Sequence, residues 1–597
     1  MCGINLVLNG LDGATAIQKM MEATVHRGPD HSAWYAIDDR IFVAGNRLKT
    51  LDLSEAANQP VVLKDGSATL VWNGALYNLE ALRNQLLDEG VQFESRADAE
   101  VLIQWLKSQG EKGIQRLEGM YALIFIDHRK KKIIVARDPY GKKPLYYHHH
   151  KDRWLFSSEA RGIIASGLVE RQFNTSQYLP YFYSRHTFPD QSFFEGVKQV
   201  MPGEIYSIDF SGSILSKTTY TFDQTPQPLP DLNSFKEMVV DAVLKNFHAD
   251  VPVGLILSGG VDSTLLLQAW YQETGQPLHT FTAVFAAPYQ SKYNDPSYAA
   301  QVAKKYRCAH HEILITPELV LQHWDSYISS LDQPVGDSAS FLTWMIAKEA
   351  KQHVKILISG AGADELFSGY DRHQAFKWYL RHRNKLRFLS QQDWVHRMLP
   401  RRVKKLLKAV AETPEVSYLN FSSLQTIPVA EQKAFLSYFP SEFPPYKAAL
   451  LWDRSYYLVN DILKIHDNAT MAHGVEGRAP YLDKALVTLS HCMTEAQHLT
   501  MEGKFWMKQL LKREGWASIA SRKKLGFGLP LEEWLQEDTA FSKEVLATVK
   551  SFGESAGGEF PDEMSNLARQ PHEQKREAFL QIWNLFVLAS WKSYQGL

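Results

Sequence analysis

The sequence predicts an α+β N-terminal domain, followed by an α/β domain built on a parallel sheet with a helical C-terminal part. Three observations lead to this prediction: short apolar runs between turns in the first third of the chain, a buried strand followed by a glycine turn and a helix in the middle, and helical periodicity near the end. Hydrophobic residues make up 45% of the 597 residues and charged residues 22%, which is typical of a globular protein and argues against wholesale disorder.

The first predicted domain covers residues 2–215 and is rich in strands. Its apolar runs are short, and turn residues such as Asp65-Gly66 separate them. Helical patterns at residues 79–87 and 99–106 lie between the strands. The strands are expected at residues 61–63, 68–72, 122–126 and 132–136.

A proline-rich polar stretch predicts a linker over residues 216–232, and the second domain is expected over residues 233–597. Its first strand is uniformly apolar, as in a buried parallel sheet, and a helix follows at residues 264–271. Helical patterns separate the strands, which indicates a doubly wound sheet. The chain is mostly helical beyond residue 375. The strands are expected at residues 253–257, 280–285 and 354–358.

Charge and composition exclude several classes of protein. The net charge is -1, so there is no overall basic field for nucleic acid. The sequence has no run of about 18 apolar residues, so no membrane span is expected. The N-terminus carries no secretory signal, and three cysteines cannot form a disulfide framework. We therefore expect a protein of the reducing cytoplasm.

Cys2 is a candidate nucleophile because it follows the initiator methionine. Removal of Met1 would leave a thiol beside a free α-amine, which titrates near pH 8 and can act as a base. One residue that carries both nucleophile and base is a known device of covalent catalysis.

Four polar positions could complete a site for an amino acid with a side-chain amide. Arg47 suits a bidentate grip on a carboxylate, and Asp98 could pair with an ammonium group. Asn73 and Gly74 end a predicted strand, and an amide side chain beside a glycine N–H is suited to an oxyanion hole. The predicted reaction is attack by Cys2 on the side-chain amide of such an amino acid.

These residues stand in segments that resemble the class II, N-terminal-nucleophile glutamine amidotransferases. The resemblance implies an αββα sandwich and a glutaminase activity for this part of the chain. One departure is Ala75, where the family usually has a glutamate that helps to receive the substrate amine; we expect weaker glutamine binding. The matching segments are residues 1–4, 26–30, 46–48, 73–78 and 137–146.

A second candidate site begins with the string Leu257-Ser-Gly-Gly-Val-Asp-Ser263, between a strand and a helix. Glycines let backbone N–H groups approach phosphate, and a helix N-terminus favours anions. The lysine of the kinase or GTPase loop is missing. Asp262 would repel a bare phosphate, which implies a bridging Mg²⁺.

A second carboxylate, Asp364, follows another predicted strand, as a partner metal ligand should if both loops lie at one edge of the sheet. Lys524 precedes a glycine-rich turn and could stabilise charge on phosphorus and on a tetrahedral intermediate. Only the fold could bring these side chains together.

Segments 258–263, 359–367, 467–483 and 522–530 resemble the synthetase domain of the glutamine-dependent asparagine synthetase family. The resemblance implies an ATP-pyrophosphatase fold, ATP and Mg²⁺ as cofactors, and a homodimer. It implies that Asp262 and Asp364 bind the metal and that Lys524 stabilises the charged intermediates. It assigns the nucleotide to Ser258, Gly259, Gly260, Asp262, Ser263, Ser359 and Gly360.

The function that the resemblance implies is the synthesis of asparagine from aspartate, with ammonia delivered from glutamine through a dry passage between the domains. Ala361 departs from the family, which often has a glutamate there for the ammonia step. The alternative is therefore the same chemistry on another carboxylate, such as a metabolite or sugar acid. A regulatory homologue that only binds nucleotide or amino acid, and a ligase independent of glutamine, are disfavoured because Cys2, Arg47 and the loop carboxylates are retained.

Overall fold

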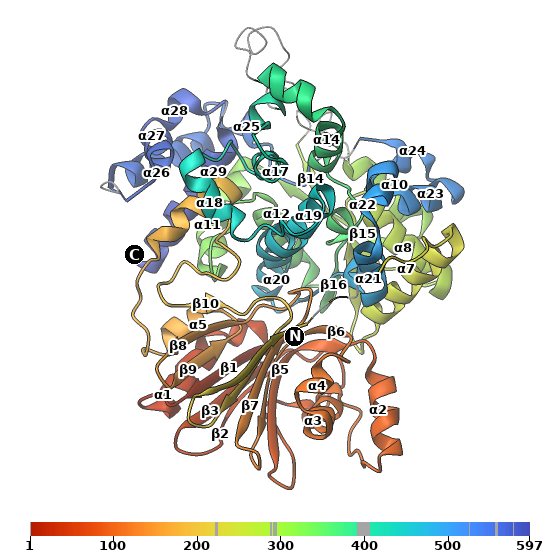
Figure 1. Cartoon of the computed structure of the whole chain (residues 1–597), viewed down its shortest axis with the longest axis vertical. Helices are drawn as coiled ribbons and strands as arrows, with labels where there is room; N and C mark the ends of the chain where they lie inside the picture. The colour runs from red at the N-terminus through yellow and green to blue at the C-terminus, as the bar shows by residue number, and fades with distance from the viewer. Residues whose placement is uncertain are drawn as a thin grey trace.

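The chain forms two lobes, one built mainly from residues 2–219 and one from the residues that follow (Figure 1). The computed structural model describes residues 2–220, 222, 225–286, 289, 295–390, 406–523, 526–555, 559–576 and 578–597. Lys524, one of the predicted site residues, lies outside these ranges.

The first lobe contains two antiparallel sheets that pack face to face. One sheet runs in the order β10-β8-β9-β1-β3-β2 and the other in the order β12-β11-β7-β6-β5-β4. The strands are β1 (Cys2–Leu8), β2 (His31–Ala36), β3 (Ile41–Arg47), β4 (Val61–Val62), β5 (Ala68–Leu76), β6 (Gly119–Asp127), β7 (Lys132–Arg137), β8 (Tyr146–His150), β9 (Arg153–Ser157), β10 (Lys198–Gln199), β11 (Glu204–Asp209) and β12 (Ile214–Thr219).

Alternation along the strands explains the layers. Ile4 and Leu6 of β1 pack against Ile124 and Ile126 of β6 in the core between the sheets. Helices α1 and α5 cover the outer face of the first sheet, and α2 and α3 cover that of the second. This αββα sandwich confirms the predicted fold. The helices are α1 (Gly13–Ala23), α2 (Leu79–Asp88), α3 (Asp98–Gln109), α4 (Glu111–Ile114), α5 (Ala160–Ala165) and α6 (Tyr178–Ser184).

The second lobe is built on a parallel sheet in the order β15-β14-β13-β16-β17, as the doubly wound prediction requires. β13 and β16 are neighbours, so the loops that follow them meet at one edge of the sheet. The outer strands β15 and β17 were not predicted. The strands are β13 (Val253–Ile256), β14 (His279–Phe285), β15 (Ala309–Ile315), β16 (Ile356–Ile358) and β17 (Glu476–Arg478).

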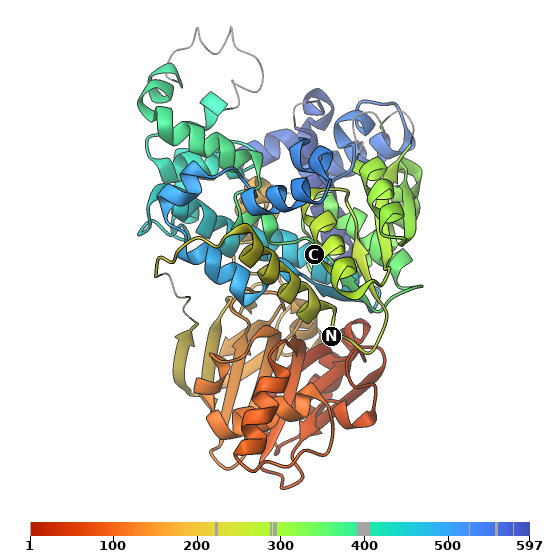
Figure 2. The ribbon, with the colours of Figure 1, turned by 90° about the vertical axis from the view of Figure 1, so that its right-hand side faces the viewer.

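Helices cover both faces of the parallel sheet (Figure 2). One face packs on α7 (Leu232–Phe247), α8 (Val261–Thr274), α10 (Asp295–Lys305) and α23 (Phe505–Arg513). The other packs on α11 (Pro317–Ser330), α12 (Ala339–Ala350), α20 (Lys464–Met471) and α29 (Phe579–Gln595).

The remaining C-terminal helices confirm the helical character predicted beyond residue 375. A π-helix, η4 (Asp453–Leu463), runs directly into α20. The helices are α13 (Ala363–Leu366), α14 (Asp371–Ser390), α17 (Pro414–Ser422), α18 (Val429–Leu436), α19 (Pro445–Trp452), α21 (Lys484–Cys492), α22 (Glu495–Thr500), α24 (Ala517–Ser521), α25 (Leu531–Trp534), α26 (Ala540–Ser555), α27 (Asp562–Arg569) and α28 (Pro571–Gln574).

The two lobes are joined by buried charges as well as by the chain. Between β12 and α7 lie residues 220–231. Arg27 of the first lobe contacts Glu159 at 2.8 Å and Asp467 of α20 at 2.9 Å. Asp30, three residues on, accepts a hydrogen bond from Lys355 at 2.9 Å. Loop 26–30 of the first lobe is therefore fixed to the second lobe at two points.

Among the described residues, none of the helices has the length and apolarity needed to cross a membrane.

Replacing Arg27 with Met should lower the free energy of unfolding by about 3–5 kcal/mol, the usual cost of leaving buried partner charges unpaired. The side chains of Arg27, Glu159 and Asp467 are 0%, 4% and 4% exposed, so water cannot take the place of the guanidinium. Urea denaturation followed by circular dichroism measures the change. Arg40→Met is the control, because that side chain is 55% exposed. Equal shifts for both variants would contradict the prediction.

Candidate active sites

Cys2 is the first residue of β1 and lies opposite Arg47 of β3 in the sheet register. The side chain is buried, and burial raises the pKa of its thiol above the ordinary value. Gln59 donates a hydrogen bond from Nε2 to the Cys2 sulfur at 3.2 Å, while its Oε1 accepts from the Trp72 amide at 2.7 Å. Gln59 was not predicted; its only signal in the sequence is its place before Pro60, which marks a turn.

Asn73 and Gly74 lie on β5, next to Cys2. Asn73 accepts a hydrogen bond from the Cys2 amide to Oδ1 at 3.0 Å. Its Nδ2 is buried and has no hydrogen-bond partner among the described residues, so a donor remains for an incoming oxygen. Gly74 admits no side chain, because a Cβ there would stand 2.2 Å from the Met120 carbonyl oxygen. The structure thus brings the predicted oxyanion donors beside the predicted nucleophile.

The guanidinium of Arg47 is buried and engaged by segment 51–58 of its own lobe. It donates to the Ser54 carbonyl at 2.6 Å, to Asn58 Oδ1 at 2.8 Å and to the Asp52 carbonyl. A substrate carboxylate at Arg47 would therefore share donors with this loop or displace part of it.

Asp98 is the first residue of α3, and its carboxylate accepts a hydrogen bond from the Ala99 amide at 2.8 Å. Burial raises the pKa of Asp98 to about 7, against the opposing effect of that hydrogen bond and of Arg47. The charges of Arg47 and Asp98 also act on the Cys2 thiol, so the fold gathers the predicted glutamine-binding residues around the nucleophile. Ala75, directly after Gly74, is buried and adds no charge.

The second site lies where β13 passes through a tight loop into α8. Gly259 has a φ of +67°, a backbone conformation that favours glycine, and Gly260 caps α8. The Ser263 hydroxyl oxygen accepts from the Ser258 amide at 3.2 Å and lies at the same distance from the Ser258 hydroxyl. The loop is thus closed on itself, in front of a helix N-terminus.

The carboxylates of Asp262 and Asp364 converge on one cation, the ammonium of Lys504. Its Nζ lies 2.7 Å from Asp262 Oδ1 and 2.6 Å from Asp364 Oδ1. Burial alone would lower the pKa of Lys504, but the two carboxylates raise it above its ordinary value. Two carboxylates within reach of one position are a donor set that fits Mg²⁺, so this structure is compatible with the implied metal.

Lys504 was not predicted, because a single lysine after a glycine carries no spacing signal. Its site is tightly packed. A Cβ on Gly369 would stand 2.1 Å from Asp364 Oδ1 and 2.2 Å from Lys504 Cε. A Cβ on Gly360 would lie 2.9 Å from that of Asp262, so the two predicted loops touch directly. The neighbouring Ser359 is half-buried, and its hydroxyl oxygen is buried with no hydrogen-bond partner among the described residues.

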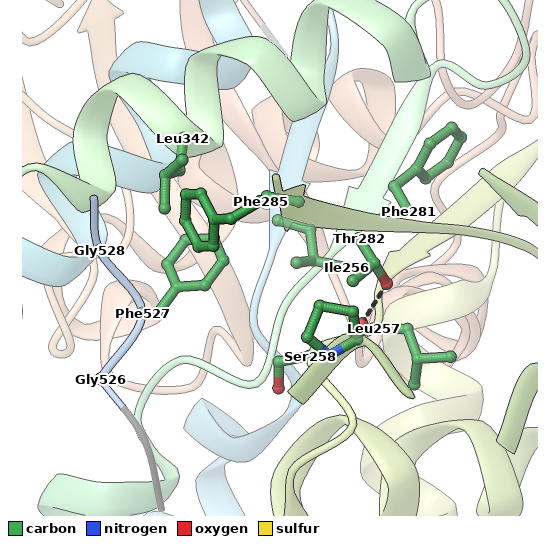
Figure 3. Close-up of a pocket in the computed structure, with 12 residues that line it drawn as sticks. Ile256, Leu257, Ser258, Phe281, Thr282, Phe285, Leu342, Gly526, Phe527 and Gly528 are labelled. Atoms are coloured by element: carbon green, nitrogen blue, oxygen red, sulfur yellow. Dashed lines mark hydrogen bonds between the residues drawn. The ribbon is translucent and has the colours of Figure 1, made fainter. Parts of the chain in front are cut away.

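An apolar pocket opens beside Ser258 (Figure 3). In Figure 3, Phe285 and Phe527 lie below Leu342, and Thr282 donates a hydrogen bond to the Leu257 carbonyl at the opposite side. The shape and apolar walls suit a flat aromatic base.

The predicted Lys524 lies outside the described residues, but the nearby Arg522 contacts the loop that follows β13. Arg522 donates from Nη2 to the Gly259 carbonyl at 3.0 Å. The glycine-rich turn that follows Lys524 in the sequence supplies Gly526 and Phe527 to the pocket wall.

A buried carboxyl that the sequence did not reveal stands next to Asp364. Burial and the neighbouring Asp364 raise the pKa of Glu365 to about 7. The Tyr370 hydroxyl donates to Glu365 Oε1 at 2.5 Å. Glu365 is four residues after Ala361 in the sequence, so the chain keeps a carboxyl close in sequence to the position where the family glutamate is missing.

Comparison with known families divides the chain as the two sites do. The family model of asparagine synthase matches residues 234–593. The family model of the glutamine amidotransferase domain matches residues 1–221.

Similar proteins extend over nearly the whole chain. Asparagine synthetase [glutamine-hydrolyzing] 1 of Bacillus subtilis is 27% identical over 99% of this chain and 96% of its own length. A putative asparagine synthetase [glutamine-hydrolyzing] of Mycobacterium tuberculosis is 27% identical over 98% of this chain and 94% of its own. Amidase chry2 of Gibberella zeae is 28% identical over 63% of this chain and 60% of its own.

Proposed function

This chain belongs to the asparagine synthase family, and we propose that it is a glutamine-dependent asparagine synthetase whose acceptor is aspartate. It is an ATP-dependent ligase with glutamine as the donor of the amide nitrogen. The observation that carries the proposal is that the carboxylates of Asp262 and Asp364 both contact one cation. In the same chain, Cys2 lies beside Asn73, whose side-chain Nδ2 has no hydrogen-bond partner among the described residues. Each half of the reaction thus has its own set of side chains.

In the first half-reaction, the Cys2 sulfur attacks the side-chain amide of glutamine. Asn73 Nδ2 and the Gly74 N–H would donate to the oxyanion of the tetrahedral intermediate. Arg47 would hold the substrate carboxylate and Asp98 its ammonium group. Collapse of the intermediate releases ammonia and leaves a thioester, and water then releases glutamate.

In the second half-reaction, the aspartate side-chain carboxylate attacks the α-phosphorus of ATP and displaces pyrophosphate. Asp262 and Asp364 would hold the Mg²⁺ that accompanies ATP, which neutralises charge on the phosphates. The N-terminus of α8, with Ser258, Gly259, Gly260 and Ser263, would cradle the pyrophosphate. Ser359 and Gly360 would line the nucleotide from the neighbouring loop, and Lys524 would stabilise the charged intermediates. Ammonia then attacks the acyl carbon, and AMP leaves.

We propose that neutral ammonia passes along the junction of the two lobes. A small cavity at the junction is lined from both lobes, by Lys142 and Lys464 among others. Burial lowers the pKa of both lysines to about 8, so most of each remains cationic at neutral pH. Positive walls repel ammonium and leave uncharged ammonia unaffected.

One observation favours a carboxylate acceptor other than aspartate: the side chain of Ala361 cannot transfer a proton. If aspartate is not the acceptor, the same adenylation and amidation would act on another carboxylate, such as a metabolite or sugar acid. In either case, we propose that the protein is cytoplasmic and forms a homodimer.

Replacing Cys2 with Ala should abolish amide formation from glutamine and leave amide formation from ammonium chloride within about twofold of the parent rate, because only the first half-reaction needs the thiol. Liquid chromatography of the amide product measures both. Cys492→Ala, which removes a buried thiol elsewhere, is the control. Loss of both activities in the Cys2 variant, with the fold intact, would contradict separate sites.

Glutamine binding should weaken as the pH falls below 7. The carboxylate of Asp98, whose pKa is raised to about 7, pairs with the substrate ammonium only when it is deprotonated. The KM for glutamine should rise by up to about tenfold per pH unit below that value. Asp98→Asn should remove this dependence and raise the KM at neutral pH by roughly 10- to 100-fold. Glutamate release measures KM, and Asp39→Asn, whose side chain is 93% exposed, is the control. An Asp98→Asn enzyme with the parent pH profile would show the assignment to be wrong.

The processed enzyme, given ATP, Mg²⁺, glutamine and aspartate, should form asparagine, AMP and pyrophosphate in equal amounts, as mass spectrometry can determine. Omission of aspartate should abolish pyrophosphate release, because adenylation needs the carboxylate. Glutamate release without aspartate-dependent pyrophosphate would reject aspartate in favour of another carboxylate acceptor.

A further inference from the structure

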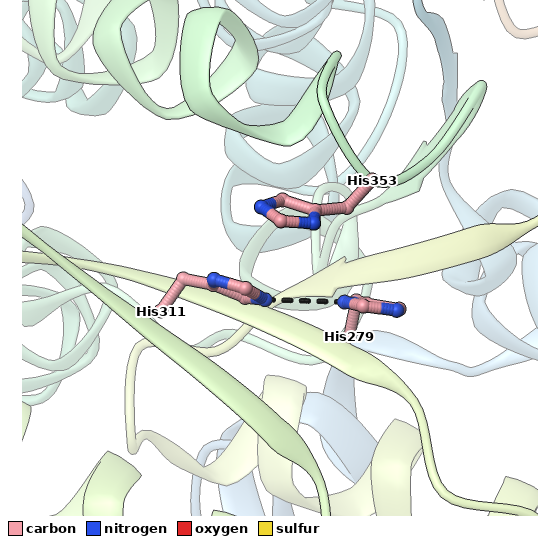
Figure 4. Close-up of side chains that lie close together, drawn as sticks. All are labelled: His279, His311 and His353. Atoms are coloured by element: carbon pink, nitrogen blue, oxygen red, sulfur yellow. Dashed lines mark hydrogen bonds between the residues drawn. The ribbon is translucent and has the colours of Figure 1, made fainter.

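Three imidazoles meet at the edge of the parallel sheet that lies opposite the nucleotide loops (Figure 4). His279 is the first residue of β14, and His311 is the third residue of β15. His353 lies in the turn between α12 and β16. The nucleotide loops follow the carboxyl ends of β13 and β16, so the three histidines belong to neither active site.

The spacing of the ring nitrogens fits a shared metal ion. His279 Nδ1 and His311 Nε2 are 3.1 Å apart. Two nitrogens bound to Zn²⁺ at about 2.05 Å stand about 3.3 Å apart at the tetrahedral angle. One ligand atom from each of the three histidines lies within 4.8 Å of the others. His353 lies on a partly exposed turn beside the other two histidines.

The surroundings keep the rings in place and in the neutral form that binds metal. The ring of His311 stacks on Phe281 with a centroid distance of 4.9 Å, and the tilted ring of His353 lies with its centroid 4.2 Å from that of His311. Burial and the neighbouring imidazoles lower the pKa of His279 and of His311. Glu349 Oε1 lies 3.6 Å from His353 Nε2, and a carboxylate behind a ligating histidine orients its ring.

We propose that His279, His311 and His353 form a binding site for a divalent transition metal ion of the Zn²⁺ class, separate from the Mg²⁺ used with ATP. Imidazole nitrogen is the ligand that Zn²⁺, Cu²⁺ and Ni²⁺ prefer, whereas Mg²⁺ prefers oxygen. The ion would tie together β14, β15 and the turn before β16 at the amino end of the sheet. Because all three segments belong to the second lobe, the site stands whether or not the acceptor proves to be aspartate.

The test uses the full chain without a histidine tag, dialysed against Zn²⁺ alone. We expect one tightly held zinc per chain by mass spectrometry of the metal. His353→Ala and His311→Asn should each weaken Zn²⁺ binding at least about tenfold, because loss of even an outer-shell partner costs that much. His150→Ala is the matched control, since that imidazole is exposed on β8 and should leave binding unchanged. Equal zinc affinity of the parent chain and His353→Ala would overturn the proposal.

Cobalt provides a second measurement that does not depend on activity. Co²⁺ bound by three imidazoles should give visible absorption bands that the His353→Ala chain lacks, and excess Mg²⁺ should not displace it. His353 is on a turn, so its variant should fold; its circular dichroism spectrum checks this. Displacement of Co²⁺ by Mg²⁺ would indicate an oxygen-ligand site elsewhere and would count against the histidine cluster.

Discussion

Buried carboxylates stay charged only beside cations, and two clusters in this structure follow from this requirement. Asp262 lies in the first turn of α8 and Asp364 in the first turn of α13, and both contact Lys504, so the ammonium holds the two segments together. Glu159 and Asp467 come from different lobes and share Arg27. The same arrangement, two carboxylates on one cation, therefore joins the halves of the adenylation site and joins the lobes themselves.

The second of these clusters has a consequence for coupling. Arg27 belongs to loop 26–30 beside the strand that carries Arg47, and Asp467 lies on α20, which packs on α12 and β17. A shift of loop 26–30 would therefore act directly on α20 of the second lobe through the ion pair between Arg27 and Asp467. Buried pairs of this kind have few alternative arrangements, so motion should pass through them as a unit.

The sequence was sufficient for what local pattern and short motifs determine. The α/β class of the second lobe, the central strands and the two loops after β13 and β16 were predicted from apolar runs and glycine placement, whereas the αββα sandwich of the first lobe was predicted from the resemblance to the amidotransferases. β15 was not predicted because it is an edge strand with exposed positions and two histidines. β17 was not predicted because a strand of three residues is too short to show a periodic pattern. Lys504, Gln59 and the three clustered histidines could not be predicted, since only tertiary packing brings single polar residues together. The acceptor could not be predicted from the sequence either, because no residue pattern identifies it.

β17 supplies the last strand of the parallel sheet from deep within the helical part of the chain. The first lobe is complete at Thr219, whereas β17 ends at Arg478, which is 259 residues later (478 − 219). At a synthesis rate of about 5–20 residues per second, roughly 10–50 s pass on the ribosome between these two points. During that time the glutaminase sandwich can fold, while β16 still exposes an unpaired edge. The nascent chain would thus contain the nucleophile before the site that consumes ammonia is complete. Chaperones would encounter this partly folded chain.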